Sequence, residues 1–175
     1  MRLSKKVCLI GDFAVGKTSL VRRFVYDMFD DKYLSTIGVK VSRKQLSLPY
    51  AKGTGAPPTV ELTMMLWDLA GSEEFTQVRA SYLRGTAGAV LVCDLTRPET
   101  LDSLHAYADD LWRISPTAHI ILAANKQDLV DEQQLTVDQI AAAATELNAP
   151  FYLTSAKTGH GVETVFSHLG RLLLT

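Results

Sequence analysis

The feature that most constrains the fold of this chain is "GDFAVGKT", residues 11 to 18, which satisfies the spacing G-x-x-x-x-G-K-T. The apolar run "KVCLI" precedes this stretch and a segment of helical period follows it, so we expect a strand, a tight loop and a helix in succession. Gly11 and Gly16 permit a tight turn whose backbone N–H groups face inward, and the following helix presents its positive end to the same point. A loop of this kind is typical of sites that bind phosphate groups.

Two side chains of this loop indicate which ligands it would bind. Lys17 would reach the β- and γ-phosphates of a nucleoside triphosphate as a point charge, and Thr18 would ligate Mg²⁺ through its hydroxyl. The alternative is an ordinary glycine turn before a helix, which the strand, loop and helix context disfavours. The residues that we expect to contact the nucleotide here are Gly11, Phe13, Ala14, Val15, Gly16, Lys17, Thr18 and Ser19.

Short apolar runs alternate with segments of helical period along the rest of the chain. "AGAVLVCD", "HIILAAN" and "PFYLTS" suit parallel strands that are covered on both faces. Residues 39–48 and 59–68 are strand-like and have no helix between them, so we expect a β-hairpin with a long Gly/Pro-rich tip. The pattern predicts a three-layer α/β fold: a mostly parallel six-stranded sheet, one antiparallel edge hairpin, and helices on both faces. Apolar stripes over 101–112 and 162–173 predict two of these helices, and the 175 residues suit a single domain over 1–175.

Composition limits the classes of partner. The formal net charge is −1 and the sequence pI about 6.4, so no basic field draws the whole molecule to nucleic acid or anionic lipid. We find no apolar run near the roughly twenty residues that span a bilayer, and the start is too weakly apolar for a signal peptide, so we expect a cytoplasmic protein. Cys8 and Cys93 lie inside apolar runs, which favours buried, reduced thiols over a disulfide or metal ligands.

Three further motifs come directly after predicted strands. "WDLAG" places Asp68 where its carboxylate could hold Mg²⁺ or a water, and Gly71 where backbone could approach a γ-phosphate. "NKQD", at 125 to 128, follows "HIILAA", and "TSAK", at 154 to 157, follows "PFYL". All three therefore lie at the carboxyl ends of strands, which is the edge where doubly wound sheets bind ligands.

These four motifs, in this order and together with "STIGV" at 35 to 39 and "SYLRG" at 81 to 85, resemble the Ras-like small GTPases over nearly the whole chain. The resemblance is closest to the Rab-like branch, and a bacterial relative or a Roc-type GTPase domain would both fit. It implies the P-loop NTPase (G-domain) fold and a switch that binds GTP and GDP with Mg²⁺. Thr36 would then join Thr18 and Asp68 at the metal, and its amide would contact the γ-phosphate.

The resemblance also implies how the base is read. Asp128 would accept hydrogen bonds from the ring N–H and the amino group of guanine, and the Ala156 amide would donate to the carbonyl of the base. Adenine lacks that amino group and would leave the carboxylate unpaired, a mismatch worth up to about 10⁴ to 10⁵ in discrimination. The aliphatic stems of Lys126 and Lys157 would flank the two faces of the purine. Asn125 and Ser155 would tie the "NKQD" and "TSAK" loops together. Phe29 matches an aromatic across the guanine edge, or is a packing residue at a helix exit.

Regulators and effectors would contact the segments near 29–40 and 69–82. Trp67 alternates with Leu66, so strand period turns its side chain away from the face that holds Leu66. In Rab-like relatives this tryptophan belongs to an apolar patch that effectors contact; the alternative is burial beneath the second of these segments.

Two departures from the family pattern concern hydrolysis. Ser72 stands where the family has its water-orienting glutamine, and its hydroxyl is too short to reach a water in line with the γ-phosphate. Phe13 replaces a small residue, and its ring would crowd an incoming arginine finger. We expect a weak GTPase whose reaction centre comprises Lys17, Thr36, Gly71 and Ser72, with Glu73, Glu74 or Gln77 as substitutes for the glutamine. The alternatives are a GTP-binding scaffold without meaningful turnover, and a dimer in which one chain completes the site of the other.

Two other departures concern the surroundings of the site. Residues 49–58 make the hairpin tip about ten residues long, where two to five are usual, and this insertion is either a tolerated loop or a partner-specific element. No cysteine follows Cys93 in this sequence, so we expect no prenyl anchor on this chain as given.

Overall fold

A computed structural model describes residues 1–32, 38–50, 59–71 and 76–175, without the side chains of 76–78. The described strands are β1 (Arg2–Ile10), β2 (Val39–Pro49), β3 (Thr59–Leu69), β4 (Gly88–Asp94), β5 (His119–Asn125) and β6 (Phe151–Leu153). The helices are α1 (Lys17–Tyr26), α2 (Thr76–Leu83), α3 (Glu99–Asp102), α4 (Leu104–Ile114), α5 (Val137–Glu146) and α6 (Val162–Leu172), with a 3₁₀ turn over Val130–Glu132.

The strands form a six-stranded sheet in the order β2-β3-β1-β4-β5-β6. β2 and β3 pair antiparallel, with Val39 opposite Leu69 and Pro49 opposite Thr59, and every other neighbouring pair is parallel. All seven residues of β4 are buried, as expected for a central parallel strand that is covered on both faces. The predicted α/β sheet with one antiparallel edge hairpin is therefore confirmed.

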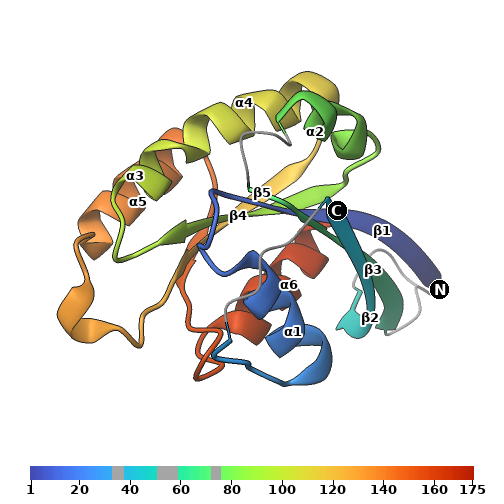
Figure 1. The fold of residues 1–175 in the computed structure, drawn as a ribbon. Helices are drawn as coiled ribbons and strands as arrows, with labels where there is room; N and C mark the ends of the chain where they lie inside the picture. The colour runs from blue at the N-terminus through green and yellow to red at the C-terminus, as the bar shows by residue number, and fades with distance from the viewer. Residues whose placement is uncertain (33–37, 51–58, 72–75) are drawn as a thin grey trace.

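Helices cover both faces of this sheet. In Figure 1, α1 and α6 lie on one face and α2, α3, α4 and α5 on the other. Phe24 of α1 stacks on Phe166 of α6 with ring centroids 4.1 Å apart, which ties these two helices together. Leu66 belongs to the apolar cluster that includes Phe24, whereas Trp67 packs against the cluster that includes Leu104 of α4, as the strand period predicts. Among the described helices, none is long and apolar enough to cross a membrane.

The helical segments differ from the sequence prediction in three places. The apolar stripe over 101–112 is divided between α3 and α4, with Ser103 between them. The Ser103 hydroxyl donates to Asp12 of the loop after β1. Helices α2 and α5 were not predicted. The N-cap of α5 is Thr136, whose side chain accepts from the Gln139 amide while the Gln139 side chain accepts from the Thr136 amide, a reciprocal N-terminal cap.

The parallel strands end at one edge of the sheet, and this positions the site. β1, β3, β4, β5 and β6 run in the same direction, so the loops that follow them meet at their carboxyl ends. The glycine-rich loop, Asp68, Asn125 and the "TSAK" segment therefore converge, although they are far apart in the sequence.

Candidate functional site

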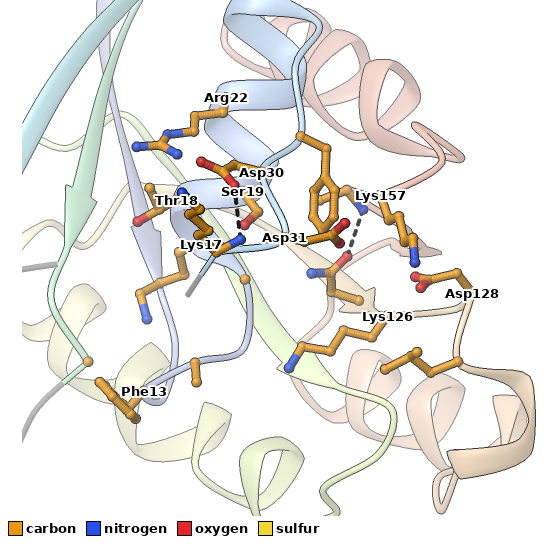
Figure 2. A pocket seen from close by; sticks show the side chains of 18 of the residues that line it. Phe13, Lys17, Thr18, Ser19, Arg22, Asp30, Asp31, Lys126, Asp128 and Lys157 are labelled. Atoms are coloured by element: carbon orange, nitrogen blue, oxygen red, sulfur yellow. Dashed lines mark hydrogen bonds between the residues drawn. The ribbon is translucent and has the colours of Figure 1, made fainter. Parts of the chain in front are cut away.

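A cavity of about 340 Å³ lies at this edge of the sheet, within the size range of small-molecule sites. In Figure 2, Lys17 and Thr18 lie on one side of it and Asp128 and Lys157 on the other. Most of the predicted site residues that the structure describes line it: Phe13, Ala14, Gly16, Lys17, Thr18, Ser19, Phe29, Gly71, Asn125, Lys126, Asp128, Ala156 and Lys157. The remaining four do not line the cavity, but each is hydrogen-bonded to a residue that does: Gly11, Val15, Asp68 and Ser155.

Lys17 is the buried cation of the glycine-rich loop. Its ammonium donates to the carbonyls of Gly11, over 2.8 Å, and Asp12, over 2.9 Å. Burial lowers the pKa of Lys17 to about 8, although the charges of Asp68 and Asp12 oppose this shift. The structure therefore holds an ammonium group in a place where a negatively charged ligand would stabilise it.

Two glycines are required by close contacts at this loop. Gly16 has φ +105°, and a Cβ on it would lie 2.2 Å from the side-chain amide nitrogen of Asn125. A Cβ on Gly71 would lie 2.6 Å from the backbone of Asp12 and Phe13. The loop after β3 thus contacts the glycine-rich loop at Gly71. The approach of Gly71 to a γ-phosphate stays a prediction.

Thr18 and Asp68 form a pair of oxygen groups suited to a hard cation. The Thr18 hydroxyl donates to one carboxylate oxygen of Asp68, and the other carboxylate oxygen is buried without a hydrogen-bond partner among the described residues. Burial raises the pKa of Asp68, and the hydrogen bond from Thr18 and the charge of Lys17 oppose that effect. An unpartnered buried carboxylate oxygen is costly, and a Mg²⁺ ion that shares its ligands with phosphates would satisfy it. These residues therefore fit the metal.

The "NKQD" and "TSAK" segments are joined by Asn125. Its amide nitrogen donates to the Val15 carbonyl over 3.0 Å, and its amide oxygen accepts from the Thr154 hydroxyl over 3.1 Å. Ser155 donates from its hydroxyl to one oxygen of Asp128 over 2.7 Å, which orients that carboxylate toward the cavity. The predicted tying role of Asn125 and Ser155 matches these bonds.

The amide of Ala156 has a different partner from the one that the resemblance implies. It donates to the amide oxygen of Asn125 over 3.3 Å, a long hydrogen bond. Arg23 of α1 fixes the same segment from outside, because its guanidinium donates to the carbonyls of Ala156, over 2.9 Å, and Lys157, over 2.6 Å. Sequence analysis did not find Arg23, because nothing local marks a helix arginine as the partner of a loop so far along the chain.

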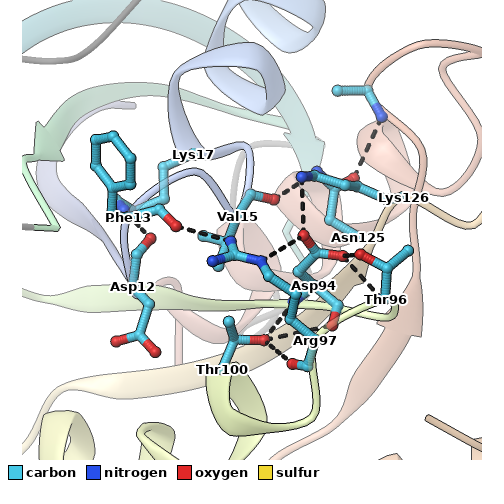
Figure 3. Close-up of polar contacts among 11 residues, drawn as sticks. Asp12, Phe13, Val15, Lys17, Asp94, Thr96, Arg97, Thr100, Asn125 and Lys126 are labelled. Carbon is cyan, nitrogen blue, oxygen red and sulfur yellow. Dashed lines mark hydrogen bonds and ion pairs between the residues drawn. The ribbon is translucent and has the colours of Figure 1, made fainter. Parts of the chain in front are cut away.

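Asp94 and Arg97 are two further residues of the site that sequence analysis missed (Figure 3). Asp94 is fully buried at the end of β4, and it accepts hydrogen bonds from Arg97 and from Lys126. Asp94 is the last residue of an apolar strand and Asp68 the last but one of another, so the same signal in "VLVCD" could have identified it.

Three aromatic side chains that the sequence analysis singled out lie at or near the cavity or on β3. Phe13 lines the cavity with 48% of its surface exposed. Phe29 lines the cavity and also packs on the apolar cluster that contains Phe24 of α1; its contact with a guanine base stays a prediction. Trp67 is half-buried, with the Lys6 ammonium 3.9 Å from its ring centroid and the Tyr82 ring beside it.

Several predicted residues lie outside the described part of the chain. These are Thr36, Ser72, Glu73 and Glu74, together with the side chain of Gln77 and most of the 49–58 insertion.

The fold and the cavity together define a P-loop nucleotide-binding α/β domain. The family model for the Ras family matches residues 6–175, and the chain therefore belongs to the Ras family. Members of this family are GTP-binding GTPases that act as switches, generally use Mg²⁺ with the nucleotide, and typically work with regulators and effectors.

Proposed function

We propose that this protein is a Rab-like switch that binds GTP and GDP with Mg²⁺ in the described cavity and hydrolyses GTP slowly to GDP and phosphate. The observation that carries this proposal is convergence: the Lys17 loop, the Thr18 and Asp68 pair, and the Asp128 loop all meet at one cavity. The first two suit the phosphates and the metal, and the third suits the base. We place the whole switch in one domain over 1–175.

Asp128 would select guanine. One of its oxygens is held by the Ser155 hydroxyl, so the carboxylate is oriented before a base arrives. The ring N–H and the amino group of guanine can both donate to it, whereas adenine offers no such pair and would leave the second carboxylate oxygen desolvated without a partner. The Ala156 amide would assist only by exchanging its long bond with Asn125 for one with the base carbonyl.

Lys17 would hold the phosphates. On binding, phosphate oxygens would replace the carbonyls of Gly11 and Asp12 as partners of its ammonium, and a charged acceptor is stronger than a neutral one. The amino terminus of α1 and the loop amides would add to this electrostatic stabilisation. Mg²⁺ held by Thr18, Asp68 and Thr36 would neutralise phosphate charge and help stabilise the leaving group.

Hydrolysis would be slow because the water is poorly positioned. Ser72 is too short for the glutamine's task, and the exposed Phe13 ring at the cavity would obstruct an arginine from another protein. The ammonium and the loop amides still stabilise the transition state, so some turnover should remain. Effectors would read the state of the segments near 29–40 and 69–82. Trp67 would either belong to an apolar patch that they contact or be buried beneath the second segment.

The test is single-turnover hydrolysis of GTP preloaded on the purified protein with Mg²⁺, comparing wild type with Ser72→Gln. A slow wild type and a clearly faster variant would support the proposal, and a brisk wild type that the substitution barely changes would contradict it. Bound GTP that never turns over in either protein would favour the scaffold alternative. A rate per molecule that rises with protein concentration would favour completion of the site by a second copy.

A further inference from the structure

Arg97 bridges a buried carboxylate and the phosphate loop (Figure 3). It lies three residues beyond the end of β4, and its Nε donates to Asp94 Oδ2 over 3.0 Å. Its Nη2 donates to the main-chain carbonyl of Phe13 over 2.7 Å. Two donors of one planar guanidinium are thus fixed at different places, which determines the orientation of the whole group.

Asp94 is a rigid anchor for this arginine. Its Oδ1 accepts from the amide and the hydroxyl of Thr96, over 2.8 and 2.7 Å, and its Oδ2 also accepts from Lys126 Nζ over 2.8 Å. Burial would raise the pKa of Asp94, but the hydrogen bonds from Lys126, Thr96 and Arg97 outweigh that effect and lower it. The carboxylate therefore stays ionised and fully bonded in the interior.

The bond to the Phe13 carbonyl fixes one peptide plane of the loop. The peptide bond between Phe13 and Ala14 is trans, so the Ala14 N–H points away from the side to which the Phe13 carbonyl points. With the carbonyl held by Arg97, the direction of this N–H is fixed as well, at a residue that lines the cavity. Ala14 itself has φ +63°, an uncommon conformation for a residue other than glycine.

We propose that Arg97, held by Asp94, is a positioning residue that aims the Ala14 amide at the β-phosphate of a bound guanine nucleotide. This inference rests on the proposed function, because the amides of such a loop receive the α- and β-phosphates. The charged guanidinium also polarises the peptide through its carbonyl and makes the Ala14 N–H a stronger donor. Because Asp94 also binds Lys126, the same carboxylate supports the loop that reads the base.

The experiment uses GDP-bound protein and two spectroscopic signals. We would measure the ³¹P chemical shifts of GDP and the ¹H–¹⁵N shift of the Ala14 amide in wild type, Arg97→Ala and Arg97→Lys. The rate at which a fluorescent GDP analogue dissociates would be measured on the same proteins. Arg113→Ala is the matched control, because Arg113 is an exposed arginine in an ion pair with Asp110 on α4.

In Arg97→Ala we expect the β-phosphate and Ala14 signals to move and GDP to dissociate about ten- to a hundredfold faster, as for the loss of one charge-assisted hydrogen bond. Arg97→Lys should recover part of this change, since an ammonium can reach one acceptor but cannot bridge both. Arg113→Ala should match wild type.

An Arg97→Ala protein with a lower melting temperature but unchanged β-phosphate shift, Ala14 shift and release rate would overturn the inference and leave Arg97 a purely structural residue. If Arg97→Ala does not fold, Arg97→Lys decides by the same readouts, and wild-type values in it would overturn the inference. Failure of wild type to bind GDP at all would instead overturn the proposed function.

Discussion

Asn125 donates from its amide nitrogen to the carbonyl of Val15 over 3.0 Å, and this bond joins the end of β5 to the glycine-rich loop. Its amide oxygen accepts from Thr154, so one buried side chain connects three loops of the site. Replacing it would leave buried polar groups without partners, and each such group costs about 1 to 3 kcal/mol.

Asn125→Ala should therefore lower the free energy of unfolding by roughly 2 to 4 kcal/mol and accelerate release of bound GDP. Urea denaturation of the nucleotide-free protein measures the first effect and stopped-flow fluorescence the second. Gln134→Ala, at an exposed amide side chain, is the control and should change neither quantity. Unchanged urea stability in Asn125→Ala would show that the three loops hold their positions without this side chain.

Gly16→Ala tests the tight contact between the loop and Asn125. The added methyl group would meet the Asn125 amide nitrogen at 2.2 Å, and φ +105° is unfavourable for alanine whatever the space. We expect nucleotide affinity to fall at least about a hundredfold, since either the loop or Asn125 must move. Calorimetric titration with GDP measures this. Gly85→Ala is the control for a positive φ without a steric clash, because Gly85 has φ +72° and a Cβ on it would meet nothing within 4 Å. Equal losses of nucleotide affinity in the two variants would contradict the steric explanation.

The sheet and most of the cavity could be predicted because their signals are local. Continuous apolar runs mark buried strands, glycines with fixed spacing mark the tight loop, and polar residues after strands mark the ligand edge. The same rule applied to "VLVCD" would have found Asp94, and the Thr136 and Gln139 spacing would have marked the start of α5.

The remaining parts depend on tertiary contacts that a sequence pattern does not encode. Arg97 reaches a carbonyl 84 positions away, and Arg23 reaches one 133 positions away. Both bonds are made to main-chain atoms, so no residue type at the acceptor end marks them. The hydrogen bond from the Ser103 hydroxyl to Asp12 likewise joins distant parts of the chain.

Stability at alkaline pH should depend on the buried thiol of Cys93. Burial, with a contribution from Asp94, raises the pKa of Cys93 from 9.0 to about 12. Between these values the unfolded chain loses the thiol proton and the folded protein keeps it, so the free energy of unfolding falls as pH rises.

The expected loss from this thiol is about 1.4 kcal/mol per pH unit once the unfolded thiol is largely ionised. Urea denaturation under reducing conditions at pH 8, 10 and 11 would compare wild type with Cys93→Ala. The other titrating groups are the same in both proteins, so the difference between their free energies of unfolding reports the thiol of Cys93. The variant should be less stable at pH 8, because it loses buried sulfur, and its stability should decline less steeply above pH 9.0. Parallel curves would contradict the raised pKa.

Metal dependence should be lost with the carboxylate of Asp68. In wild type, removing Mg²⁺ with EDTA should accelerate release of bound GDP at least about tenfold, because Thr18, Asp68 and the phosphates would share the ion. In Asp68→Ala, release should already be fast in Mg²⁺ and EDTA should add little. Asp109→Ala, at an exposed carboxylate on α4, should keep the full response to EDTA.

The same substitution separates binding from stability. One Asp68 oxygen is buried without a partner among the described residues, and burial raises the pKa of this carboxyl, so the ionised group is unfavourable in the nucleotide-free protein. Asp68→Ala should therefore melt at a temperature no lower than wild type when nucleotide and metal are absent, despite the lost bond with Thr18. A variant that melts clearly lower yet responds to EDTA as wild type does would assign Asp68 a structural role and place the metal elsewhere.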